Sequence, residues 1–196
     1  MTSDDSINKN TETETPKKQP QRVFFALWPD DATRAAIDRF TRSAVDQCGG
    51  TPIAPENFHM TLRFVGHADA GAMARMRKAA ERVRTEPLRF TLDQLGFWQE
   101  PAVFWLGCRK APDPLLRLVV NLNTEMGSEG FMVETRPFKP HVTLARNARQ
   151  APQSELYEKV EWSSDKFVLV GSRSDENGPT YTVLDEWPLS GKLREA

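Results

Sequence analysis

The stretch His59-Met60-Thr61-Leu62 returns later in the chain as His141-Val142-Thr143-Leu144, and the two copies contain two of the three histidines present. Each copy lies in an apolar run that predicts a β-strand, over residues 58–65 in the first case and 141–145 in the second. Side chains alternate between the two faces of a strand, so the histidine and the threonine of each copy point the same way. The residues between and after them then face the core. Similar predicted elements flank both copies, which indicates two related lobes rather than two independent domains.

Two histidine–threonine pairs that face one another would suit chemistry at a phosphodiester. Imidazoles titrate near neutral pH, so one can take a proton from a nucleophile while the other protonates a leaving oxygen. Attack at phosphorus is in line, which requires the base and the acid on opposite sides of it. Thr61 and Thr143 can donate hydrogen bonds to the non-bridging oxygens. The residues do not tell which histidine is the acid and which is the base, because the two copies are alike.

Two arginines are candidates for holding the charge of a bound phosphate. Arg63 directly follows the first copy, and Arg146 lies close after the second. The spacing of Arg146 from His141 is odd, which would turn it away from the site in an unbroken strand; a bend or bulge would return it. Phe58 and Phe138 lie near the histidines in the sequence and are expected to line the cleft. No spacing typical of a metal site, such as H-E-x-x-H or D-x-D, is present, so no metal or cofactor is expected.

Composition divides the chain into a polar N-terminal segment and one folded domain. Residues 1–21 have almost no aliphatic side chains and predict a disordered tail, because such a segment buries too little to offset its loss of entropy. Residues 22–190 predict a single α+β domain with no internal linker. The expected strands cover 22–28, 58–65, 88–93, 95–99, 102–108, 141–145, 166–172 and 180–189, and the expected helices cover 32–47, 70–84, 113–126 and 152–159.

The bulk properties exclude several classes of protein. The net charge is -1 at pH 7, so any affinity for an anion must come from local arrangement. Cys48 and Cys108 form no C-x-x-C pair, which favours a reducing compartment over a disulfide framework. No apolar run is long enough for a transmembrane helix, and the chain does not start like a signal peptide. A cytoplasmic protein without membrane contact is expected. A monomer is also expected, although no sequence feature specifies the oligomeric state.

The chain resembles the two-histidine phosphoesterases in three stretches: Arg22-Val-Phe-Phe-Ala-Leu-Trp-Pro29, Pro55-Glu-Asn-Phe-His-Met-Thr-Leu-Arg-Phe-Val-Gly66 and Arg136-Pro-Phe-Lys-Pro-His-Val-Thr-Leu-Ala-Arg146. Within that class it is most similar to the RNA 2′,3′-cyclic phosphodiesterases, also called 2′-5′ RNA ligases. The resemblance covers residues 22–189. It implies a bilobal α+β fold, in which two pseudo-twofold-related lobes of antiparallel sheet carry helices outside and a cleft between them.

The resemblance also implies a reaction: metal-independent hydrolysis of a 2′,3′-cyclic phosphate at an RNA end to a 2′-phosphate, with reverse 2′-5′ ligation permitted. His59 would donate a proton to the leaving 3′ oxygen, and His141 would accept one from water. Thr61, Thr143 and Arg146 would hold the phosphate. The expected partner is therefore RNA that ends in a cyclic phosphate.

Two other functions remain open at this point. One is hydrolysis of a small cyclic phosphate, such as a nucleoside 2′,3′-cyclic phosphate, since no sequence feature selects a polymer over a mononucleotide. The other is an RNA-end binding module with little turnover. The intact histidine and threonine in both copies disfavour that second alternative, because a pure binding site needs no pair of proton-transfer groups.

Overall fold

A computed structural model describes residues 21–151, 158–175 and 178–191. Within them, eight strands form one antiparallel sheet in the order β10-β9-β1-β3-β7-β6-β5, with β2 beside β7. Two further strands, β4 and β8, pair with each other. The strands are β1 (Gln21–Leu27), β2 (Thr51–Pro52), β3 (Met60–Ala68), β4 (Leu88–Leu92), β5 (Gln94–Trp98), β6 (Val103–Gly107), β7 (His141–Arg146), β8 (Val160–Ser164), β9 (Lys166–Asp175) and β10 (Gly178–Pro188).

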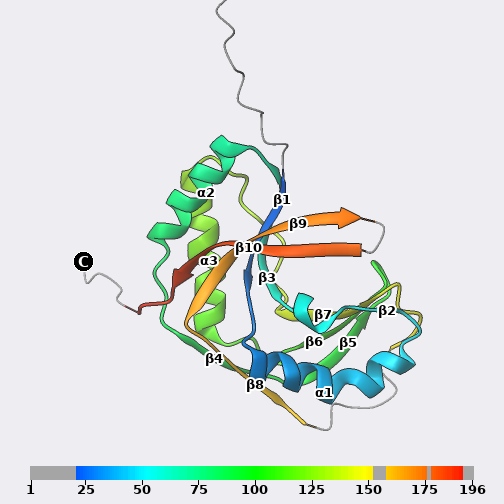
Figure 1. Cartoon of the computed structure of the whole chain (residues 1–196). Helices are drawn as coiled ribbons and strands as arrows, with labels where there is room; N and C mark the ends of the chain where they lie inside the picture. The colour runs from blue at the N-terminus through cyan, green and yellow to red at the C-terminus, as the bar shows by residue number, and fades with distance from the viewer. Residues whose placement is uncertain (1–20, 152–157, 176–177, 192–196) are drawn as a thin grey trace, which may run out of the picture.

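The large sheet consists of two lobes that meet at its centre (Figure 1). Strands β10, β9, β1 and β3 form one lobe, and β7, β6, β5 and β2 form the other. Among the described residues, β3 and β7 share one backbone pair, Met60 with Val142. Each of these residues lies between the histidine and the threonine of its motif, and both side chains are fully buried. Because β3 and β7 run antiparallel, an approximate twofold axis that passes through this pair relates the two motifs.

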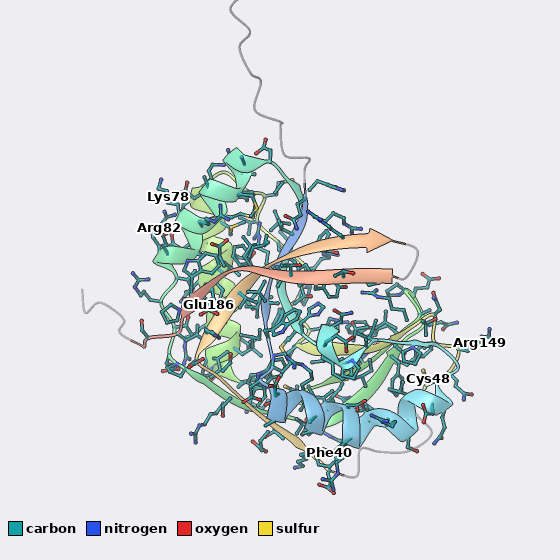
Figure 2. All side chains as sticks on the ribbon, viewed as in Figure 1. Phe40, Cys48, Lys78, Arg82, Arg149 and Glu186 are labelled. Carbon is teal, nitrogen blue, oxygen red and sulfur yellow. The ribbon has the colours of Figure 1, made fainter. Side chains whose placement is uncertain are left out.

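Helices cover the outside of both lobes. Helix α1 (Asp31–Gln47) packs on β7 and β8, whereas α2 (Ala70–Arg82) and α3 (Asp113–Ser128) pack on each other and on β3. Figure 2 shows this division: Phe40 on α1 and Cys48 just after its C-terminal end lie on one lobe, and Lys78 and Arg82 mark α2 on the other. A short 3-10 helix, η1 (Pro55–Asn57), leads into the first motif. The predicted bilobal α+β fold is confirmed.

Local sequence signals account for the helices. The carboxylate of Asp30 caps α1 by accepting a hydrogen bond from the backbone N–H of Thr33 at 2.7 Å, and Asp69 caps α2 in the same way. Such caps contribute about 1 kcal/mol each. Helix α3 buries an apolar stripe at helical spacing, which consists of Leu115, Leu118, Val119, Leu122 and Met126.

The structure corrects four details of the predicted elements. The first motif's strand does not end at Gly66, because β3 continues to Ala68 with Gly66 at φ +94°. Strand β8 was not predicted. Gln21 belongs to β1, where it pairs with Ala68, so it is not part of a tail; residues 1–20 lie outside the described part of the chain. Phe58 is a core residue, as described below. The helix predicted over 152–159 also falls mainly outside the described residues.

Candidate active site

The two motifs present their functional side chains on one face of the sheet, as the alternation predicts. Met60, Leu62, Val142 and Leu144 are buried in the core. The histidine and the threonine of each motif lie on the opposite face and are partly exposed. The core side chains thus anchor each strand while the polar pair faces the space between the lobes.

A bulge in β7 decides where Arg146 points. In the pairing of β6 with β7, Trp105 lies opposite Thr143 and Phe104 lies opposite Ala145, so Leu144 is an extra residue. Leu144 and Ala145 are consequently both buried in succession, and the alternation is reset after them. Arg146 therefore returns to the face that carries His141. The bulge that Arg146 needs in order to face the site, given its odd spacing from His141, is therefore present.

The same irregularity occurs in β3, at the corresponding position of the first motif. Phe25 pairs with Arg63 and Ala26 pairs with Thr61, so Leu62 is the extra residue. Phe64 then occupies the place that Arg146 holds in the second motif, and its side chain is 51% exposed. Sequence reasoning missed Phe64. The signal was available, because Phe64 follows His59 at the same spacing as Arg146 follows His141.

Two hollows meet between the lobes and together form the cleft. The first, of about 600 Å³, is called here the aromatic hollow; its lining includes Thr61, Phe64, Trp98, Phe138, Lys139 and His141. The second, of about 370 Å³, is called the basic hollow; it is lined by Arg22, Phe24, His59, Thr61, Phe64, Arg146, Ser172, Pro179 and Tyr181. Thr61 and Phe64 belong to both linings, so the hollows join at these residues. Each hollow contains one of the two motif histidines.

Backbone carbonyls orient both imidazoles in the same way. Nδ1 of His59 lies 2.7 Å from the carbonyl oxygen of Asn57, and Nδ1 of His141 lies 2.7 Å from the carbonyl oxygen of Lys139. A carbonyl oxygen can only accept, so Nδ1 carries the proton in each neutral ring. The lone pair is therefore on Nε2. Each histidine is prepared to take or give a proton through Nε2.

Burial keeps both imidazoles neutral in the free protein. Loss of solvation is the main cause that lowers the pKa of His59 from 6.5 to about 4; the charge of Arg146, and that of His141 whenever it is protonated, add to it, and the hydrogen bond to Asn57 acts in the opposite sense. Burial and then Arg146 also lower the pKa of His141 below its ordinary value. The same arginine thus acts on both histidines, which places its charge near both rings.

Two of the predicted substrate-binding residues have other surroundings. Arg63 is 7% exposed, and its guanidinium donates to the side chain of Asn123 and to the carbonyl oxygen of Met132. It lines the aromatic hollow but has its terminal nitrogens engaged. The expectation that Phe58 lines the cleft is wrong: it is 3% exposed and packs in the core, beside a separate hollow next to α1. Phe58 precedes His59 by one residue, and adjacent side chains in extended backbone point to opposite faces.

Phe138 lies where the sequence placed it, in the wall of the aromatic hollow together with Trp98. Thr143 is partly exposed between the buried Val142 and Leu144, on the face of β7 that carries His141, but it lines neither hollow. Among the described residues, no group of three histidine, cysteine, aspartate or glutamate side chains could hold a metal ion. No helix in the described part of the chain is long and apolar enough to cross a membrane.

A two-lobed α+β fold in which each lobe contributes one histidine–threonine pair to a shared cleft is the arrangement of the two-histidine phosphoesterases. The chain belongs to the 2′-5′ RNA ligase superfamily, whose family model matches residues 29–176. The family expected from the sequence motifs is therefore confirmed.

Individual relatives agree with this membership. The chain is 32% identical over 174 residues to the RNA 2′,3′-cyclic phosphodiesterase of Escherichia coli K12, covering 88% of this chain and 98% of that protein. It is 30% identical over 182 residues to the protein of the same name from Thermus thermophilus, covering 87% and 91%. The crystal structure of apo E. coli LigT superposes with a TM-score of 0.80 at 31% identity, covering 88% of this chain and 99% of that one. LigT has also been crystallised with 3′-AMP and with phosphate, and these structures superpose with TM-scores of 0.80 and 0.77.

Proposed function

We propose that this protein hydrolyses 2′,3′-cyclic phosphates at RNA ends to 2′-phosphates. The observation that carries the proposal is the pair of imidazoles, one from each lobe, that are held by backbone carbonyls and open to one cleft. The names of the relatives support the same reaction.

The reaction needs a base on one side of the phosphorus and an acid on the other. His141 takes a proton from water through Nε2, and the water oxygen bonds to phosphorus. The bond from phosphorus to the 3′ oxygen breaks, and His59 supplies a proton to that oxygen. The product is a 2′-phosphate with a free 3′-hydroxyl. The reaction leaves His141 protonated and His59 deprotonated, and proton exchange with solvent restores the starting state of both rings.

His59 must carry a proton to act in this way, and burial opposes that in the free protein. A bound phosphodiester is an anion, and a negative charge beside an imidazole favours its protonated form. Substrate binding would therefore raise the pKa of His59 from its low starting value. The positive charge of Arg146 and the hydroxyls of Thr61 and Thr143 would hold the non-bridging oxygens as charge develops.

The aromatic hollow suits a nucleobase. Phe64, Trp98 and Phe138 offer ring faces and edges, and the side chain of Lys139 lies over the Trp98 ring at 5.9 Å. Stacking of a base on an aromatic side chain contributes about 1–3 kcal/mol and tolerates any sequence. Binding of the terminal nucleotide in this hollow would present its phosphate to Thr61 and His141.

The same arrangement supports the reverse reaction. A 5′-hydroxyl of a second RNA can take the place of water, attack the cyclic phosphate and release the 3′ oxygen, which leaves a 2′-5′ linkage. The incoming 5′-hydroxyl would then approach from the side of His141, and His59 in the basic hollow would again serve the leaving 3′ oxygen.

The deciding experiment follows a short RNA with a 2′,3′-cyclic phosphate end in the presence of EDTA. We expect wild type to yield a 2′-phosphate, and His59→Ala and His141→Ala each to reduce kcat by at least about a hundredfold. His67→Ala is the matched control, because His67 is exposed and lines neither hollow. Full activity of either motif variant contradicts the mechanism. Turnover of nucleoside cyclic phosphates but not of RNA indicates a small-molecule enzyme, and binding without turnover indicates an RNA-end binding module.

A further inference from the structure

The two motif histidines are alike in sequence but not in their surroundings. Among the described residues, three aromatic rings contact His59: Phe24 with ring centroids 4.8 Å apart, Tyr181 at 5.0 Å and Trp28 at 5.6 Å. His141 has one such contact in that part of the chain, with the ring of Trp98 at 4.6 Å and an interplanar angle of 75°. The approximate twofold axis therefore relates the backbones but not the rings around the histidines.

Trp28 differs from the other rings in both geometry and position. Its indole is parallel to the imidazole of His59, with an interplanar angle of 7°, whereas the ring of Tyr181 meets His59 edge-on. Phe24 and Tyr181 line the basic hollow, but Trp28 lines neither half of the cleft. Trp28 instead lines a separate hollow of about 870 Å³ behind the site, called here the rear hollow. The indole thus contacts His59 and also lines the rear hollow, which His59 itself does not line.

The charged groups on each side of this indole are different. On the cleft side, Arg22 and Arg146 line the basic hollow with His59, and His141 acts on His59 electrostatically; none of the described side chains in that lining is a carboxylate. The rear hollow is lined by charges of both signs, from Asp30, Glu86, Arg89, Asp165 and Lys166. Removal of the indole would open His59 to water and to these charges.

We propose that Trp28 is a positioning residue for the reaction, which holds the plane of the His59 ring and closes the site against the rear hollow. Trp28 acts through His59 and does not touch the substrate. Because no ring in the described part of the chain stacks flat on His141, Trp28 makes the two histidines chemically different. The inference rests on the proposed function for its consequence in catalysis, but its effect on His59 stands apart from any substrate.

Two mechanisms follow from this position. A flat ring stacked on the imidazole restricts its rotation about χ2, so that Nε2 stays aimed at the cleft. Exclusion of water from that side of the ring contributes to the burial that lowers the pKa of His59 to about 4. The aromatic face also attracts the imidazolium once the substrate anion has brought a proton to it.

The test compares Trp28→Leu, Trp28→Phe and wild type as full-length proteins. The titration of each histidine ring is followed by NMR, with signals assigned from single histidine-to-glutamine variants. We expect Trp28→Leu to move the titration midpoint of His59 upward by about one unit or more, and Trp28→Phe to move it less in the same direction. The midpoint of His141 should stay within a few tenths of a unit. Trp98→Leu is the matched control, and it should move His141 rather than His59.

Kinetics on the cyclic-phosphate RNA give the second readout. Trp28→Leu should lower kcat by about tenfold or more with KM changed by less than about threefold, and Trp28→Phe should recover most of the loss. An unchanged His59 midpoint in both Trp28 variants overturns the proposal, and so does a loss that falls on KM alone. Should Trp28→Leu fail to fold, the Trp28→Phe titration decides. Absence of turnover in wild type would contradict the proposed function, while the titrations would still test the role of Trp28.

Discussion

The neutral state of His59 predicts a specific dependence of stability on pH. The pKa of His59 is lowered from 6.5 to about 4 in the folded protein, chiefly by burial. Between these values the unfolded chain binds a proton that the folded chain does not, so the free energy of unfolding falls as pH falls. The contribution is fully present above about pH 6.5 and is lost below about pH 4. At about 1.4 kcal/mol per unit, the shift corresponds to roughly 3 kcal/mol.

The perturbation that isolates this contribution is His59→Gln. Glutamine has a polar side chain that does not titrate, so the variant lacks the proton uptake but keeps every other titrating group. Urea unfolding, followed by tryptophan fluorescence, should be measured for both proteins from about pH 7.5 to about pH 4.5. We expect the wild type to lose about 2 to 3 kcal/mol more than the variant over this range.

His67→Gln serves as the control for the loss of a histidine outside the site, because His67 is exposed and lines neither hollow. A constant difference in the free energy of unfolding between His59→Gln and wild type is not used in the comparison. Only the difference in how the free energy of unfolding changes with pH reports on proton binding by His59. Equal slopes for wild type and His59→Gln would refute the reasoning, because His59 would then bind its proton equally well in both states. A wild type that gains stability as pH falls would contradict the sign of the shift.

Three further outcomes are expected. Arg146→Gln removes a positive charge near both motif histidines and should raise both of their NMR titration midpoints; unchanged midpoints would place that charge elsewhere. Arg63→Met leaves Asn123 and a carbonyl oxygen without their donor, so it should lower the free energy of unfolding, measured in urea, by about 1–3 kcal/mol. A large loss of kcat with unchanged stability would instead show that Arg63 contacts the substrate. Gly96→Ala would bring a Cβ into the Trp105 ring and should cost about 1–3 kcal/mol, with a change in tryptophan emission. An unaltered unfolding curve would mean that the ring moves freely.

Short-range patterns were sufficient to predict most of the elements. The apolar stripe of α3, the caps of α1 and α2 and the hairpin of β5 and β6 all depend on residues close together in the chain. The orientation of the histidine–threonine pairs follows from alternation alone, and the buried Met60 and Val142 confirm it. The family was also readable, because the two motifs and their flanks occur in order. Strand β8 was missed because its five residues contain only two large apolar side chains, Val160 and Trp162.

The remaining features of the site depend on contacts between distant segments. Arg146 reaches the cleft, and Phe64 takes the matching place, because each strand gains an extra residue against a neighbour that sequence does not identify. Arg63 donates hydrogen bonds to groups on α3 and on the loop after it, and no local sequence pattern predicts these partners.

Two identical motifs specify two identical local geometries, since backbone alternation and the carbonyl two residues earlier orient both imidazoles alike. Their chemical difference comes from side chains contributed by other strands and by the segment after β1, which enclose His59 in aromatic rings and leave His141 more open. Solvation of an imidazole depends on everything packed around it, whereas its orientation depends on its own strand. The motifs therefore determine the pair of histidines, and the tertiary packing determines how each of them holds its proton.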